Sequence, residues 1–316
     1  MKKWLLIAMA LLVAGVLAAC GAGEKGESAT AEAQEKETMT VTHELGETTF
    51  EKNPKKVVVF DFGVLDTMDK LGIEAAGVPQ ESLPAYLDKY ADTEKYENVG
   101  TLKEADFEAI NAMKPDLIII SGRQADMYEE YAAIAPTVHI AVDTDNYMES
   151  FTGNMELIGE IFGKEEQVKE ELSAITEQVE QVKETVNASQ QQALIVLANE
   201  GKVSAYGPSS RFGIIHDVFG VKAVDEGLEV STHGQSVSFE YILEKNPGMI
   251  FVVDRNAAVG NEASAKDSLE NELVQKTDAY KNEKIIYLDP DYWYLSGGGL
   301  QSVSQMVTDV ETAFKE

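Results

Sequence analysis

One stretch of the sequence occurs twice in similar form. DFEAINAMKPDLIIISGR (106–123) aligns without a gap with SFEYILEKNPGMIFVVDR (238–255), and every matched pair of residues is 132 positions apart. Each copy has a helical pattern that ends at the residue before a proline, then a continuous apolar run, then an arginine. A helix followed by a strand buried on both faces is the unit of an α/β sheet, so the repeat predicts two lobes of the same architecture.

Apolar runs, including the two in the repeat, predict the strands of these lobes. They lie at 57–60, 117–120 and 138–142 in the first half of the chain and at 193–198, 249–253 and 284–288 in the second. Continuous β-branched runs that alternate with helical patterns are typical of parallel sheets with helices on both faces. The predicted fold is therefore α/β, with two Rossmann-like lobes built on parallel sheets, and 316 residues suit two such lobes.

A long amphipathic stretch separates the two sets of strands. Apolar residues recur at helical spacing over 151–162 and again over 168–186. We expect a single long interdomain helix over 148–187 that joins the lobes as a stiff spacer; a coiled-coil partner helix is the alternative interpretation. The predicted domains of the body are an N-terminal lobe over 40–147, this helix, and a C-terminal lobe over 188–316.

The N-terminus has the features of an export signal. Two lysines precede an apolar run at 4–16 that is too short for a stable membrane span. The run is followed by Leu-Ala-Ala-Cys at 17–20, which resembles the bacterial lipobox, and Cys20 is the only cysteine of the chain. We therefore expect residues 1–19 to be a lipoprotein signal peptide and Cys20 to carry the lipid; a plain secretory signal with an accidental cysteine is the alternative. Residues 20–39 contain no aromatic side chain and are predicted to be a flexible tether.

Charge and cysteine content exclude several classes of function. The formal charge of −29 disfavours partners that are bound through a polyanionic backbone, so we expect no nucleic-acid binding. A single cysteine permits neither an intramolecular disulfide nor a four-cysteine zinc site. The predicted location is the outer face of the cytoplasmic membrane, with the body held there by its N-terminal lipid.

Arginine is scarce in this chain. Of 26 basic residues only Arg123, Arg211 and Arg255 are arginines. Two of them close the matched strands, where open parallel sheets bind their ligands, and Arg211 follows a possible short strand at 203–206. A guanidinium group offers a planar fork of donors that grips carboxylate or catecholate oxygens. Three in one cleft would hold a compact, multiply charged anion; structural ion pairs, such as one between Arg255 and Asp254, are the alternative.

With these features in place, the sequence resembles the cluster A (class III) solute-binding proteins of ABC importers, and more closely those that bind ferric catecholate siderophores such as petrobactin. The resemblance is carried by NPKKVVVFDFGVLDTMDKLG, TLKEADFEAINAMKPDLIIISGRQ, SAYGPSSRFGIIHDVFGV, STHGQSVSFEYI and WYLSGGGL. It implies a monomeric receptor that performs no reaction, has no permanently bound cofactor, and holds Fe(III)–siderophore between its lobes. The implied partner is an ABC permease with a cytoplasmic ATPase.

The resemblance also implies roles for individual residues. The three arginines would neutralise the iron complex, and His233 and Tyr294 would complete the coordination of Fe(III) when the siderophore supplies only two catechols. With a hexadentate siderophore these two residues would contact the ligand without touching iron. Tyr206, Phe212 and Trp293 flank the cleft elements and are candidates for stacking on ligand rings, although core packing would also explain them.

One surface glutamate per lobe is implied to dock into the permease, and Glu108 and Glu240 occupy matched positions in the repeat. Simple solvation of helix glutamates is the alternative. Rival functions are a receptor of the same fold for zinc or manganese, or for haem or another anionic chelate, and an extracellular enzyme with His233 as general base. Neither HExxH nor GxSxG occurs in the sequence.

Overall fold

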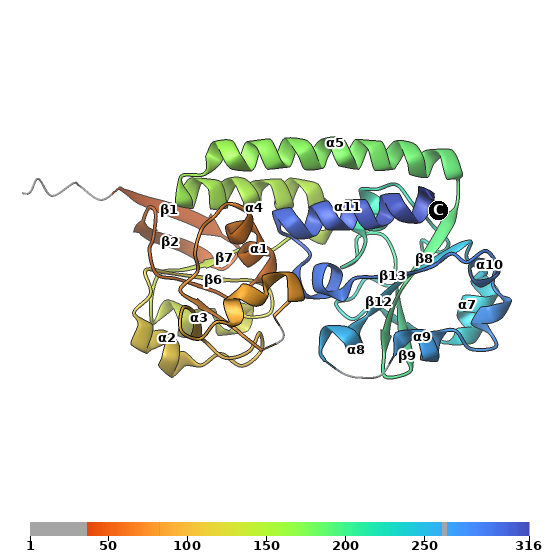
Figure 1. Cartoon of the computed structure of the whole chain (residues 1–316), viewed down its shortest axis with the longest axis horizontal. Helices are drawn as coiled ribbons and strands as arrows, with labels where there is room; N and C mark the ends of the chain where they lie inside the picture. Colours follow the sequence, from red (N-terminus) through yellow and green to blue (C-terminus); the bar gives the residue numbers. More distant parts are fainter. Residues whose placement is uncertain (1–36, 82, 261–263, 316) are drawn as a thin grey trace, which may run out of the picture. The chain divides into compact units, whose positions relative to one another are not determined.

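The structure is a computed structural model, and it describes residues 37–81, 83–260 and 264–315 (Figure 1). The predicted signal peptide, Cys20 and nearly all of the predicted tether lie outside the described residues. The first strand begins at Thr38, two residues before the predicted start of the N-terminal lobe. No helix within the described ranges is both long and apolar enough to cross a bilayer.

The N-terminal lobe is built on a parallel sheet, as predicted. Its five strands follow the order β5-β4-β3-β6-β7, and a separate antiparallel hairpin, β1–β2, precedes them. The strands are β1 (Thr38–His43), β2 (Gly46–Glu51), β3 (Val57–Val59), β4 (Gly77–Val78), β5 (Glu97–Asn98), β6 (Leu117–Ile120) and β7 (Thr137–His139). The helices are α1 (Phe62–Lys70), η1 (Ala85–Ala91), α2 (Phe107–Met113), η2 (Ala125–Met127), α3 (Tyr128–Ala132) and η3 (Thr144–Asn146).

The C-terminal lobe has a mixed sheet, which corrects the prediction of a parallel one. Its order is β11-β9-β8-β12-β13, with β10 beside β8. The strands β8, β10, β12 and β13 are parallel, whereas β9 runs antiparallel to both of its neighbours, β8 and β11. Only Glu200 and Gly201 separate the paired ends of β8 and β9, and both have positive φ, 50° and 77°. A two-residue turn of this kind joins antiparallel strands, so β9 cannot follow the parallel pattern.

The elements of the C-terminal lobe alternate less regularly than those of the N-terminal lobe. Its strands are β8 (Gln192–Asn199), β9 (Lys202–Tyr206), β10 (Lys222–Ala223), β11 (Gln235–Val237), β12 (Met249–Asp254) and β13 (Ile285–Leu288). Its helices are α6 (Ile214–Asp217), α7 (Phe239–Lys245), α8 (Arg255–Ala258), α9 (Ala265–Leu269), η4 (Val274–Lys276), α10 (Asp278–Lys281), η5 (Asp291–Ser296) and α11 (Leu300–Lys315). All six predicted apolar runs form strands, β3, β6, β7, β8, β12 and β13.

The internal repeat is a structural repeat. The side chains of Asp106 and Ser238 accept hydrogen bonds from backbone N–H groups in the first turns of α2 and α7 and so cap these helices. Both helices end at a residue in the left-handed conformation, Lys114 (φ 50°) and Asn246 (φ 43°), directly before proline. The strand that follows each helix is central in its sheet, with a paired strand on either side.

The helical stretch between the lobes consists of two helices. α4 (Tyr147–Phe162) ends at Gly163, whose φ of 63° breaks the helix, and α5 (Glu165–Ser189) continues for 25 residues as the long linking helix. α5 packs against both α4 and α11, which lie beneath its left and right parts along one edge of the molecule (Figure 1). The apolar stripe predicted over 168–186 faces these neighbours, with Val168, Ile175, Val179, Val182 and Val186 buried.

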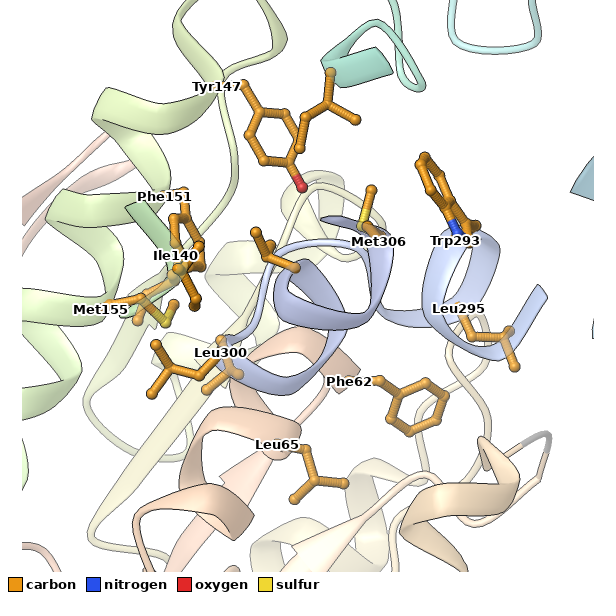
Figure 2. Packing of buried hydrophobic residues seen from close by; sticks show 14 of the residues in the cluster. Phe62, Leu65, Ile140, Tyr147, Phe151, Met155, Trp293, Leu295, Leu300 and Met306 are labelled. Atoms are coloured by element: carbon orange, nitrogen blue, oxygen red, sulfur yellow. The ribbon is translucent and has the colours of Figure 1, made fainter. Parts of the chain in front are cut away.

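α11 connects the two lobes a second time. It belongs to the C-terminal part of the chain, but its first turn lies against α1 of the N-terminal lobe. Apolar side chains of α1, α4, η5 and α11 form one continuous cluster there, including Phe62, Leu65, Phe151, Leu295 and Leu300 (Figure 2). The core therefore runs without a break from one lobe into the other.

A buried carboxylate fixes this junction. Asp66 of α1 accepts hydrogen bonds from the backbone N–H groups of Gln301 (3.2 Å) and Ser302 (3.1 Å), and Thr67 accepts one from Leu300 (3.0 Å). These groups are free donors at the start of α11, so α1 caps the N-terminus of another helix. Burial raises the pKa of Asp66 to about 7, although the hydrogen bonds favour its charged form.

Candidate functional site

A cavity of about 1130 Å³ lies between the two lobes. Its walls come from segments that follow the carboxyl ends of β3, β6, β7, β8 and β12, together with η5 after β13. This is the edge of a parallel sheet at which ligands bind in open α/β folds. The repeat predicted that ligand-binding residues follow its two strands. These strands are β6 and β12, and the residues after both of them line the cavity.

The three arginines come together at this cavity. Arg123 and Arg211 both donate hydrogen bonds to the backbone carbonyl oxygen of Tyr294, over 3.1 and 2.6 Å. Arg255 donates from Nε to the hydroxyl of the same tyrosine over 3.2 Å and from Nη1 to Asn199 Oδ1 over 2.9 Å. Residues from β6, β9 and β12 loops therefore meet around one residue of η5.

Tyr294 lies at the centre of this arrangement. The guanidinium carbon of Arg211 is 4.3 Å from the centroid of its ring, a cation–π contact. Burial alone would raise the pKa of the Tyr294 phenol, but the positive charges of Arg211 and Arg255 and their hydrogen bonds outweigh it, so the pKa is lowered. Burial in turn lowers the pKa of Arg211, and the nearby charge of Arg123 lowers it further.

The arginines have no carboxylate partners among the described residues. The basic partner of every ion pair in this part of the chain is a lysine or His139. Asp254, the alternative partner for Arg255, instead accepts hydrogen bonds from the backbone N–H groups of Ala257 and Ala265. The structural ion pair between these neighbours is therefore absent in the described chain.

Several further polar residues line the cavity that the sequence analysis did not single out. Lys103 from the N-terminal lobe and Lys202 from the C-terminal lobe add two positive charges, and Asp61 is the only acidic residue among the described lining residues. Asp61 caps α1 by accepting from Val64 N over 2.9 Å. Most basic residues of this chain are lysines, so nothing in the sequence distinguishes these two from surface lysines.

The aromatic candidates differ in their positions. Tyr206 and Trp293 line the cavity although each is almost fully buried, at 2% exposure. The Trp293 indole donates from Nε1 to Asp309 over 2.8 Å, which fixes its orientation. Phe212 is buried and is not among the lining residues, and the centroid of its ring lies 4.7 Å from that of Tyr206. Core packing, the alternative weighed for these residues, accounts for Phe212.

His233 is exposed and lines the same cavity as Tyr294. No cluster of three or more histidine, cysteine, aspartate or glutamate side chains suited to a metal ion occurs in the described ranges. The cavity instead gathers arginine and lysine side chains, which repel a bare cation. The charged side chains of the lining therefore favour an anion over a bare cation.

The two candidate docking glutamates occupy equivalent places outside the cavity. Glu108 lies in the first turn of α2 and Glu240 in the first turn of α7, and both are exposed. They are second residues of helices that the internal repeat relates to each other. Each lobe thus presents one carboxylate in the same structural position.

Sequence comparison places the chain among proteins of known class. The family model described as periplasmic binding protein matches residues 57–292. The chain belongs to this family. It is 49% identical to the petrobactin-binding protein YclQ of Bacillus subtilis (strain 168) over 320 residues, covering 100% of both chains. It is 30% identical to the ferric-anguibactin-binding protein FatB of Vibrio anguillarum (strain ATCC 68554 / 775), covering 98% of each.

Solved structures give the same result for the fold. The crystal structure of YclQ matches with a TM-score of 0.87 and 51% identity, covering 89% of this chain and 100% of that chain. The periplasmic catecholate-siderophore binding protein VctP from Vibrio cholerae matches with a TM-score of 0.83 and 37% identity, covering 87% and 100%. The predicted family and the predicted two-lobed class III fold are confirmed.

Proposed function

We propose that this protein is a lipid-anchored extracellular receptor that binds a ferric catecholate siderophore of the petrobactin type and delivers it to an ABC importer. The observation that carries the proposal is the convergence of three guanidinium groups, without a described carboxylate partner, on one interlobe cavity. A ferric catecholate is a compact polyanion whose oxygen edges match the donor fork of arginine.

The size and the lining of the cavity support a large chelate over a bare ion. Its volume of about 1130 Å³ is slightly above the usual range of small-molecule sites, about 300–1,000 Å³, which suits a ligand of several rings. Tyr206 and Trp293 offer aromatic surface, and Val230, 57% exposed, offers an apolar contact. The names of the relatives agree, since YclQ is a petrobactin-binding protein and VctP a catecholate-siderophore binding protein.

His233 and Tyr294 are proposed to act on the cargo iron only when the siderophore leaves coordination positions open. The lowered pKa of Tyr294 favours a phenolate, the form in which tyrosine binds Fe(III). A hexadentate siderophore fills every coordination position of the iron, so both residues would then contact oxygen atoms of the siderophore. The visible absorption band of the bound complex distinguishes these cases, because it changes on Tyr294→Phe only if the phenolate binds iron.

The remaining parts of the proposal concern the surroundings of the receptor. Cys20 is proposed as the lipidated residue that holds the body at the outer face of the membrane, and Glu108 and Glu240 as contacts for the permease. The receptor acts as a monomer, has no resident cofactor and returns its ligand unchanged. Analysis of the ligand after release would reveal turnover if the protein were an enzyme.

The test of the binding function uses the natural fluorophore of the site. The sequence has two tryptophans, Trp4 and Trp293, and removal of residues 1–19 leaves only the latter, which lines the cavity. Its emission is expected to be quenched by a ferric catecholate with a dissociation constant below about 1 µM, since three charge-assisted contacts contribute about 1.5–3 kcal/mol each.

The titration compares ferric petrobactin with hydroxamate, citrate and haem complexes and with Zn²⁺ and Mn²⁺ alone. Preference for catecholates supports the proposal. Binding of the bare ions, or no retention of any ferric catecholate in gel filtration, would contradict it.

A further inference from the structure

The acceptors that orient the three arginines are all uncharged. They are the backbone carbonyl oxygen of Tyr294, its hydroxyl, and the amide oxygen of Asn199. The chain contains 55 acidic residues against 26 basic ones, so a carboxylate would be the most available neighbour for any arginine. The amino-acid composition alone would therefore favour acidic neighbours, and the neutral acceptors at all three arginines are a specific feature of this site.

Carboxylates are present close by in the sequence but do not reach Arg255. Glu200 follows Asn199 directly and is not among the lining residues, and Asp254, directly before Arg255, is engaged with two backbone N–H groups. Asn199 thus occupies the acceptor position at 2.9 Å from Arg255 Nη1. An aspartate has the same shape as asparagine and would accept the same hydrogen bond, but it would also cancel the charge of the arginine.

We infer that Asn199 is a positioning residue that orients the Arg255 guanidinium toward the ligand while leaving its positive charge uncompensated. The inference rests on the proposed binding of an anionic chelate. Two of the donors of Arg255 are fixed by Asn199 and Tyr294, so the donors that remain are held in place for ligand oxygens. Neutral acceptors achieve this orientation, and the cavity keeps its full attraction for an anion.

The experiment compares Asn199→Asp with Asn199→Ala. If orientation alone mattered, Asp would bind the ferric catecholate better than Ala, because it keeps the acceptor. If the charge must stay uncompensated, the order is reversed: Ala loses about threefold in affinity, because one of the two contacts that orient Arg255 is missing, and Asp loses about tenfold or more. Asn187→Asp on α5, at an exposed asparagine, adds the same charge elsewhere and should change affinity by less than about twofold.

A second measurement does not depend on the ligand. Arg255 is one of the charges that lower the pKa of Tyr294, so Asn199→Asp should return this pKa toward that of an ordinary tyrosine, and Asn199→Ala should leave it low. The ultraviolet signal of tyrosinate, with Tyr294→Phe as background, measures it. A purely structural role for Asn199 would not separate the two variants in this titration.

The outcomes distinguish this inference from the binding function. If the wild type binds no ferric catecholate, the proposed function fails, and the tyrosine titration still decides whether Asn199 keeps the charge of Arg255 free. If the wild type binds and Asn199→Asp retains at least the affinity of Asn199→Ala, or if the Tyr294 pKa is equal in both variants, the inference is overturned. Thermal melting of each variant verifies that it is folded.

Discussion

Arginine and lysine have different tasks in this molecule. Lysines form surface ion pairs, such as Lys70 with Glu171 at 3.1 Å, which contribute little to stability. The arginines form no ion pair with any described residue and contact neutral oxygens and an aromatic ring instead. This division explains why the scarcity of arginine in the sequence pointed to the site.

Substitution of Arg211 tests the role of the arginines in ligand binding. Arg211→Ala is expected to weaken binding of a ferric catecholate by about 2–5 kcal/mol, because its contact is half-buried and charge-assisted. Arg211→Lys should recover only part of this loss, since lysine has neither the donor fork nor the planar face that stacks on Tyr294.

Tryptophan quenching measures both variants. Thermal melting verifies that each variant is folded, because Arg211→Ala also loses the hydrogen bond and the ring contact that Arg211 makes with Tyr294. Wild-type affinity in Ala variants of all three arginines would refute their proposed role.

Residue type limited what the sequence could reveal about the site. The triad was predictable because arginine is rare and follows repeated strands. The sequence did not identify Asn199, Lys103 and Lys202 as site residues. Residues of these types are common in the chain, and only the folded structure shows that these three line the cavity. Phe212 was assigned to the cleft by its neighbourhood in sequence, but the direction of its side chain depends on how the turn after β9 folds.

The junction between α1 and α11 shows how one element completes another. The first backbone N–H groups of α11 find their acceptors in Asp66 and Thr67, and Tyr86 adds a hydrogen bond to Asp66 over 3.2 Å. Tyr86 also stacks on Tyr292 of η5, with ring centroids 4.3 Å apart. η5, which contains Tyr294, is therefore tied to the N-terminal lobe as well as to the arginines.

The buried carboxylate makes the stability of this junction depend on pH. The folded-state pKa of Asp66, about 7, is higher than its unfolded value of 3.8, so the folded protein binds the proton more tightly. The resulting stabilisation is complete below about pH 4 and is lost as the pH rises toward and through 7. Between pH 5 and 8 the free energy of unfolding should fall by about 2–3 kcal/mol relative to Asp66→Asn, which cannot ionise.

Urea unfolding of both proteins across this range measures the difference, in which other carboxylates cancel. Asp66→Asn also replaces one acceptor oxygen, so it should be less stable at every pH; only the change with pH reports the ionisation. Parallel stability curves for the two proteins would show that Asp66 titrates normally.

Helices and strands could be predicted where nearby residues in the sequence determine them. The six buried strands follow from continuous apolar runs, and the ends of α2 and α7 from the prolines after them. The antiparallel direction of β9 depends on a turn of two residues with positive φ, Glu200 and Gly201. Only the glycine of this pair signals such a turn in the sequence. η5 is a single π-helical turn whose Tyr294 carbonyl accepts from Arg123 and Arg211, which are distant in sequence. The conformation of η5 thus depends on tertiary contacts, which cannot be predicted from the spacing of apolar residues in the sequence.

The internal repeat places one carboxylate on each lobe in the same position, Glu108 on α2 and Glu240 on α7. Docking by Glu108 and Glu240 predicts that charge reversal of either residue to Lys lowers uptake of the iron complex into cells without changing its affinity for the receptor. Rim charges act mainly on orientation and association rate, so the double variant should reduce uptake by about tenfold or more.

Uptake is measured in a strain that depends on this receptor, and affinity by quenching of Trp293. Glu184→Lys on α5 is the matched control, because Glu184 is exposed on the linking helix and outside the repeat. Normal uptake by the double variant would contradict docking through these residues.

The last helix also sets the order in which the molecule can be completed. The N-terminal lobe receives part of its apolar core from Leu300 and Met306, and Asp66 receives its donors from the same helix (Figure 2). During synthesis α11 is made after every strand of both lobes, so the core of the first lobe stays incomplete until this helix has been made. A nascent chain that remains incompletely folded is suited to threading through a secretion channel, which the proposed export requires.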